Sequence, residues 1–143
     1  MIGKKRVSAA PSRLKLLDDT GERGVLLGTA CSRCGAHFFG SVVFCQSCTS
    51  ADPKPVELSS SGSLYSYTVV RVPPAGWQGD VPYALGQVQT LEGPHVVSQV
   101  VECPFEDLRV GMEMELALVV AGEDREGNEL VVYKWRPRQG KEG

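Results

Sequence analysis

The sequence predicts an all-β protein in which a small cysteine-bearing ribbon precedes a five-stranded barrel. Two CxxC pairs, separated by ten residues, lie near the N-terminal end. Strand-like segments with turn signals between them fill about seventy-five later residues, and no helical period of useful length interrupts them. The 16 glycines and 9 prolines favour a turn-rich architecture over a helical bundle. These three observations define the expected fold class.

Length and composition limit the chain to one ordinary domain or two very small ones. Its 143 residues are 42% hydrophobic, which is enough for a modest core and excludes wholesale disorder. The sequence has no run of 18 apolar residues, so we expect no membrane span. Its basic opening lacks the apolar segment of a secretory signal. We therefore expect a cytoplasmic protein.

Shifts in composition divide the chain into five segments. The first contains a small apolar cluster, Leu14, Leu16 and Leu17, which suits either a short helix or a docked peptide. Its basic character otherwise predicts a solvated, mobile terminus. In chain order the segments are an N-terminal arm (1–23), a ribbon (24–52), a Pro/Ser connector (53–61), a barrel (62–137) and a tail (138–143).

The barrel segment contains five stretches of β-branched, aromatic or alternating residues. Gly86 interrupts the second stretch and suits the tight bend or bulge that a small barrel needs. Five strands in this length favour a closed barrel of the OB type, although a β-sandwich or SH3-like barrel has the same periodicity. A turn or short helical link precedes the fourth strand. The stretches are 63–72, 83–91, 96–101, 114–120 and 130–135.

Four of the five cysteines form two CxxC turns, a pattern typical of a zinc ribbon. Each turn folds two thiolates toward one point, and a hairpin between the turns completes a tetrahedral site. A segment of about thirty residues cannot fold alone without such a metal. The predicted structural Zn²⁺ ligands, one ion per chain, are Cys31, Cys34, Cys45 and Cys48.

Other uses of these cysteines fit less well. A redox CxxC normally begins a helix in a βαβ unit, which this sequence lacks. Disulfides are rare in reducing compartments. Iron in a four-thiolate site shares the ligand geometry and stays open. His37 is not needed as a ligand, because four thiolates already close the site and leave no position for substrate.

No catalytic constellation is evident elsewhere in the sequence. Cys103 is unpaired, and His95 is the one base that could be combined with it. A third orienting group and a Gly-rich oxyanion loop are both missing. We therefore interpret Cys103 as a small apolar residue at a barrel end, and we expect no catalytic residues in the chain.

Aromatic residues outside the expected core are candidates for partner contact. Trp77 lies in a Gly/Pro-rich loop, where a large ring is poor core material. Phe38 and Phe39 stand together in the ribbon hairpin, and we expect one of them to pack inward. We assign partner contact to Trp77, Phe38 and Tyr83, and we interpret Trp135 as structural.

The order of two CxxC pairs, a connector and a barrel with an aromatic closing strand resembles the DUF35 family of zinc-ribbon plus OB-fold, acyl-CoA-associated proteins. The resemblance covers residues 24–137. Gln46 and Thr49 replace a proline and a glycine that are frequent around the second CxxC, and the usual proline near the ribbon tip is absent around Phe39-Gly40. The matching residues are Cys31, Cys34, Gly35, Cys45, Cys48, 62–69, 81–85, 91–93, Leu108, Val110, Gly111 and 133–137.

The resemblance implies a non-catalytic accessory subunit of a thiolase-fold enzyme that acts on CoA thioesters. Such proteins lie against a catalytic partner and help to enclose the CoA arm of the substrate. A short member is similar to the small subunit of thiolases in aromatic-compound degradation, such as benzoylsuccinyl-CoA thiolase. The resemblance thus implies a hetero-oligomer whose catalytic residues lie on the partner.

The alternative function is nucleic-acid binding, since zinc ribbons and OB barrels both serve it. Charge disfavours this alternative. Residues 1–16 carry five basic groups, whereas the rest of the chain holds 10 basic and 17 acidic groups. The stretches 83–91 and 95–101 contain no Lys or Arg, although an OB nucleic-acid site needs cationic residues on its middle strands.

Overall fold

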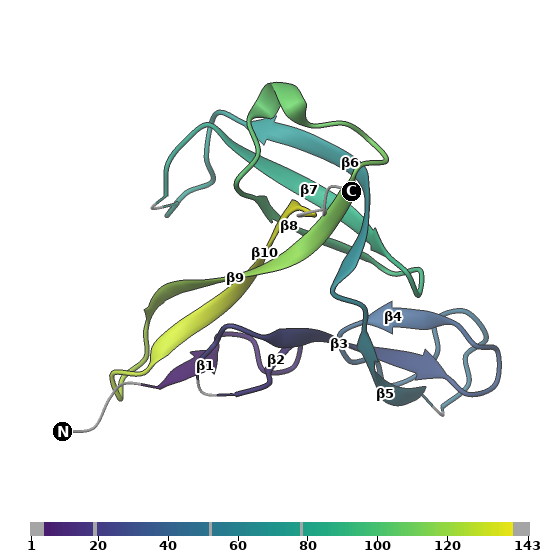
Figure 1. Ribbon diagram of the computed structural model, residues 1–143. Helices are drawn as coiled ribbons and strands as arrows, with labels where there is room; N and C mark the ends of the chain where they lie inside the picture. The colour runs from purple at the N-terminus through teal and green to yellow at the C-terminus, as the bar shows by residue number, and fades with distance from the viewer. Residues whose placement is uncertain (1–4, 19, 52, 78, 139–143) are drawn as a thin grey trace.

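The structure, a computed structural model, describes residues 5–18, 20–51, 53–77 and 79–138. It is all-β apart from one 3₁₀ turn, and it consists of a barrel above a smaller sheet that carries the cysteines (Figure 1). The described part of the chain contains no helix with the length and apolar character needed to cross a bilayer.

The barrel is closed by five strands in the OB arrangement. The order around it is β9, β6, β7, β8, β10 and back to β9, and every pair is antiparallel except β8 with β10. The parallel pair meets at Trp135 and Val100. The strands are β6 (Ser61–Val70), β7 (Tyr83–Thr90), β8 (His95–Val100), β9 (Glu113–Glu123) and β10 (Glu129–Pro137).

These strands confirm the five predicted stretches, and the predicted link before the fourth is the 3₁₀ turn η1 (Phe105–Asp107). Gly86 has a different role from the one expected. It pairs regularly with Tyr67 and Ser98, and the bulge lies on β6 instead, between Leu64 and Ser66. A Cβ on Gly86 would lie 2.7 Å from Val100 Cγ2, so packing inside the barrel requires glycine here.

The second sheet has β3 (Gly24–Cys31) at its centre. Along one edge β3 pairs with β2 (Leu14–Leu16) and then with β4 (His37–Phe39). Along the other edge it pairs with β5 (Pro53–Leu58), which lies within the expected connector. An edge strand tolerates prolines because its outer N–H groups need no ladder partner.

The expectation of a helical or mobile arm is wrong for the described arm residues. β1 (Arg6–Ser8) pairs in parallel with β10, and β2 joins the second sheet. Leu14 is completely buried, and Arg6 donates to the carboxylate of Glu129. The arm is extended because β1 pairs with the distant strand β10 and β2 pairs with the next strand, β3. The apolar cluster supplies Leu14 to the shared core.

One hydrophobic core extends from the second sheet into the barrel. Leu14, Leu26 and Leu58 belong to the same buried cluster as the barrel residues Leu64 and Trp135. The core ends near Cys31. We call residues 31–51 the distal ribbon, and its buried side chains are those of Cys31 and Cys45. The distal ribbon therefore lacks an apolar core of its own.

Candidate metal centre

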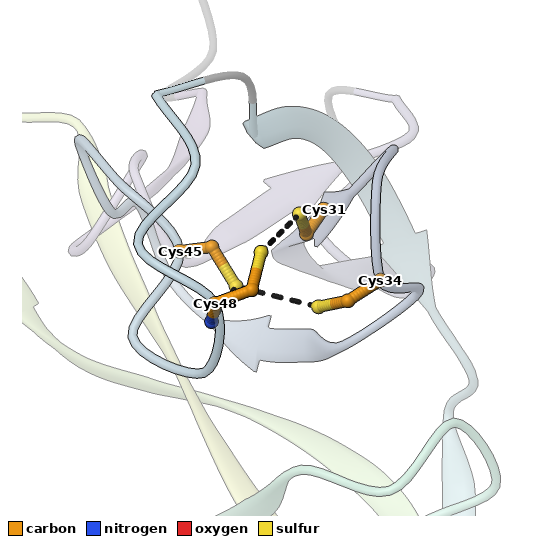
Figure 2. A group of neighbouring side chains, drawn as sticks. All are labelled: Cys31, Cys34, Cys45 and Cys48. Carbon is orange, nitrogen blue, oxygen red and sulfur yellow. Dashed lines mark hydrogen bonds between the residues drawn. The ribbon is translucent and has the colours of Figure 1, made fainter.

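The four predicted cysteines converge at the end of the distal ribbon. Cys31 ends β3, Cys34 lies in the turn before β4, and Cys45 and Cys48 come from the turn before β5. All four Sγ atoms lie within 4.8 Å of one another (Figure 2). The sulfurs of Cys31 and Cys48 are 3.6 Å apart, and those of Cys34 and Cys45 are 3.5 Å apart.

Two similar backbone turns position these sulfurs. The amide of Gly35 donates to the carbonyl of Cys31 at 2.9 Å, and the amide of Thr49 donates to that of Cys45 at 2.8 Å. Both amide residues have positive φ, 79° for Gly35 and 63° for Thr49. The first turn uses glycine for this left-handed conformation, whereas the second forces a β-branched residue into it.

Backbone N–H groups around the sulfurs favour thiolates. Hydrogen bonds from the amides of Cys34 and Arg33 lower the pKa of Cys31 to about 6. At Cys48 an amide hydrogen bond from Ser50 acts in the same direction, but desolvation and the neighbouring thiols together raise the pKa to about 12. A thiolate therefore opposes ionisation of the thiols beside it, and a cation among the sulfurs would favour it.

This donor set fits a tetrahedral metal ion. With metal–sulfur bonds near 2.3 Å, tetrahedral geometry places sulfurs about 3.8 Å apart, close to the two separations in the structure. Among the described residues, these cysteines form the one group of three or more His, Cys, Asp and Glu side chains arranged to hold a metal. His37 lies outside it, with Nδ1 at 2.9 Å from the carbonyl of Gly35.

The predicted partner residues lie in different surroundings. Trp77 is half-buried and stacks on Tyr83 with ring centroids 4.3 Å apart. Tyr83 is only 7% exposed, so Trp77 has a partner within the chain. In β4 the expectation that one phenylalanine packs inward is confirmed: Phe39 meets the ring of Tyr133 edge-on, and Phe38 stays half-buried. Partner contact by Trp77, Phe38 and Tyr83 stays a prediction.

Cys103 and His95 have separate surroundings. Cys103 Sγ faces the carbonyl of Pro104, and burial together with nearby carboxylates raises the pKa of its thiol. His95 Nδ1 lies 2.6 Å from the side-chain amide of Gln87, and its ring contacts that of Tyr65 at a tilt of 49°. A thiol with a raised pKa is a poor nucleophile, so this arrangement does not resemble a catalytic pair.

The apolar end of the distal ribbon is a further feature of the site, not expected from the sequence. Residues 41–44 form no strand opposite β4, although the hairpin was long enough for two. Val43 is 84% exposed and Phe44 is 49% exposed, immediately before Cys45. The signal in the sequence is the run of apolar residues Val42, Val43 and Phe44 directly beside a metal ligand.

Fold and site together define the class of protein: a four-cysteine ribbon joined to an OB barrel. The four cysteines lie at the end of the ribbon, away from the barrel core. The family model for the C-terminal OB-fold domain of ChsH2 matches residues 55–119. A DUF35 domain-containing scaffold protein of Methanocaldococcus jannaschii is 31% identical over 118 residues, which are 81% of this chain and 84% of the relative.

Two further relatives have catalytic assemblies in their names. The benzoylsuccinyl-CoA thiolase subunit BbsA of Thauera aromatica is 30% identical over 116 residues, covering 81% of this chain and 78% of that subunit. The solved structure of the Ltp2-ChsH2(DUF35) aldolase contains a similar chain, with a TM-score of 0.65 and 28% identity over 79% of this chain and 84% of that chain. The chain belongs to the DUF35 family.

Proposed function

We propose that this protein is a non-catalytic accessory subunit of a thiolase-fold enzyme that acts on CoA thioesters. The observation that carries the proposal is the similarity to BbsA, which extends over most of both chains and therefore includes the ribbon as well as the barrel. The name of BbsA describes a subunit of a thiolase, and that of the aldolase relative joins a DUF35 chain to a second protein.

The chemistry of the chain supports an accessory role. Four sulfur ligands saturate a tetrahedral metal and leave no open position for a substrate or water. The raised pKa of Cys103 disfavours nucleophilic attack, and His95 is engaged by Gln87 rather than by a nucleophile. The reacting groups would accordingly come from the catalytic subunit.

The proposal has several finer parts. Cys31, Cys34, Cys45 and Cys48 would hold one Zn²⁺, which would fix the distal ribbon and supply no catalytic chemistry. The complex would work in the cytoplasm, where thiolates stay reduced. Its substrates would be CoA thioesters, including those of aromatic acids, and the chain would help to enclose the CoA arm at the subunit interface.

Co-expression tests this proposal. We expect a thiolase-fold protein to be encoded beside this chain and to co-purify with it. We also expect thioester cleavage or condensation by the complex but not by the isolated chain. The zinc-loaded chain with Cys103→Ala should support the same activity. Turnover by the isolated chain that disappears in Cys103→Ala would show an enzyme instead, and absence of any thiolase-fold partner would also contradict the proposal.

A further inference from the structure

We propose that the apolar end of the ribbon, residues 42–44, is the surface that docks the catalytic subunit, directly beside the four-cysteine group. This inference rests on the proposed function, because it names the docking surface for that partner. It differs from the prediction made from sequence, which placed the main contact at Trp77.

The exposure of two large side chains is the first observation. Val43 and Phe44 are 84% and 49% exposed, and they are adjacent in the chain. They immediately precede Cys45, whose side chain is completely buried. A ligand fixed in the metal site therefore holds the exposed segment in place, and a preorganised apolar segment loses little entropy when a partner covers it.

A hollow beside this segment is the second observation. It has a volume of about 240 Å³ and lies between the distal ribbon and the outer strand β5. Val42 lines it together with Pro53, Pro55 and Val56, and no ionisable side chain takes part. The two exposed apolar side chains can insert into a partner, and the uncharged hollow beside them can receive one of the partner's apolar side chains.

The distribution of charge decides which kind of partner fits. Residues 24–51 contain no Asp or Glu and a single arginine, whereas residues 62–137 contain eleven acidic and five basic residues. Phosphate backbones require a cationic face, whereas the hollow beside residues 42–44 is lined by no cationic side chain. Protein interface cores are depleted of charge and accept aromatic and aliphatic groups, so a neutral patch on the catalytic subunit is the complementary surface.

Two aromatic groups on the barrel have ring partners within the chain, whereas Val72, Leu91 and Val110 are exposed at 86%, 76% and 67%. Trp77 covers Tyr83, and Tyr65 makes a tilted ring contact with His95, with centroids 4.4 Å apart. Val97 on β8 is 56% exposed, but its neighbour across the strands is the polar Gln87. Val97 therefore offers a matched control, because it is an exposed valine on a barrel strand, outside the proposed surface.

The experiment measures binding of the zinc-loaded full chain to the thiolase-fold protein found by co-expression. We expect Val43→Ser and Phe44→Ser each to raise the dissociation constant by at least about tenfold, with zinc content unchanged. Val97→Ser should change it by less than about twofold. In the wild-type complex, zinc should pass to a chelator at least about tenfold more slowly than in the free chain, because the partner covers the metal site.

The outcomes separate the docking surface from the proposed function. If the wild-type chain binds its partner but the ribbon variants bind equally well, the surface is assigned wrongly while the accessory role stands. Equal rates of zinc loss from the wild-type complex and from the free chain would also overturn the assignment. This comparison uses the wild type alone, so it remains valid if the variants lose their zinc. Self-association through the ribbon, detected by light scattering and removed by Phe44→Ser, would assign the surface to a second copy instead.

Discussion

The barrel buries a row of large apolar side chains, whereas the distal ribbon buries two cysteines. In the barrel, Leu64, Val88, Met114 and Trp135 have almost no exposure, and the strands close into a continuous ladder. In the distal ribbon, Phe39 packs edge-on against Tyr133 of the barrel and stays half-buried. The two regions therefore depend on different sources of stability.

This difference shows how a short segment can be held without a core. Apolar burial contributes free energy in proportion to area, and the distal ribbon has little area to bury. A metal bound by four thiolates contributes about 10–16 kcal/mol in zinc-finger peptides, which is enough to order a segment of this size. The ribbon can then expose Val43 and Phe44, because their burial is not needed for its folding.

Loss of one metal ligand should have the largest effect. Cys45→Ser removes a buried thiolate, and we expect a metal-free chain whose distal ribbon is unfolded or that precipitates. Elemental analysis measures the metal directly, with one zinc per wild-type chain expected. Cys103→Ser is the control and should keep the full equivalent. A Cys45→Ser protein with normal metal content would contradict the assignment.

Truncation of the barrel core should have the next largest effect. Trp135 is completely buried and donates its indole N–H to the carbonyl of Val96. Trp135→Ala should lower the free energy of unfolding by about 3–5 kcal/mol, because it leaves a cavity and an unpaired carbonyl. Denaturant unfolding measures this loss. If the folded fraction of this variant still binds metal, the two regions are stabilised separately. A loss of unfolding free energy below about 1 kcal/mol would contradict the importance of Trp135 for the barrel.

The backbone conformation after the second CxxC predicts a smaller, opposite effect. Thr49 has a φ of 63°, which costs a β-branched residue about 1 kcal/mol and costs glycine almost nothing. Thr49→Gly should therefore tighten zinc binding by roughly fivefold in a competition titration. Gly35→Ala, at the equivalent position after the first CxxC, should weaken it. Equal zinc affinities for the wild type, Thr49→Gly and Gly35→Ala would show that backbone strain in the two turns does not affect zinc binding.

Acid should produce the smallest effect, at the junction of ribbon and barrel. Burial opposes ionisation of Glu92, but hydrogen bonds from the amide and hydroxyl of Ser59 outweigh it and lower the pKa below 4.5. A lowered carboxyl pKa stabilises the folded state above pH 4.5, and this contribution disappears as pH falls through the folded value.

Comparison of wild type with Glu92→Gln isolates this contribution. The variant should be the less stable protein at pH 7, and the difference in unfolding midpoint should shrink below about pH 4.5. A difference that stays constant as the pH falls would mean that the Ser59 contacts do not depend on the charge of Glu92.

The features that sequence predicted well are local ones. CxxC spacing alone indicates that Cys31 and Cys34 share a centre with Cys45 and Cys48, because each turn fixes two ligands. Alternation and turn residues likewise identify the barrel strands, and the closing strand around Trp135 was recognisable from its aromatic character. These signals lie within a few residues of the structure that they predict.

The features that sequence missed depend on contacts and turn geometry that no local residue pattern encodes. β1 exists because Arg6–Ser8 pairs with β10, more than a hundred residues away, and Leu14 lies beside its sheet neighbour β3 and residues of the barrel strand β10. Trp77 is covered by Tyr83, which no periodicity reveals. A β-branched residue such as Thr49 rarely adopts a left-handed conformation. Its positive φ therefore becomes evident only in the structure of the turn that holds the cysteines.

Hydrogen exchange of the full chain before and after removal of the metal tests the central claim most directly. The account predicts that amides of residues 31–51 lose protection when a chelator removes the metal, while amides of β6 to β10 keep theirs. Protection that stays unchanged in the distal ribbon would contradict a metal-held segment. Equal loss of protection in the barrel would contradict its independent stability.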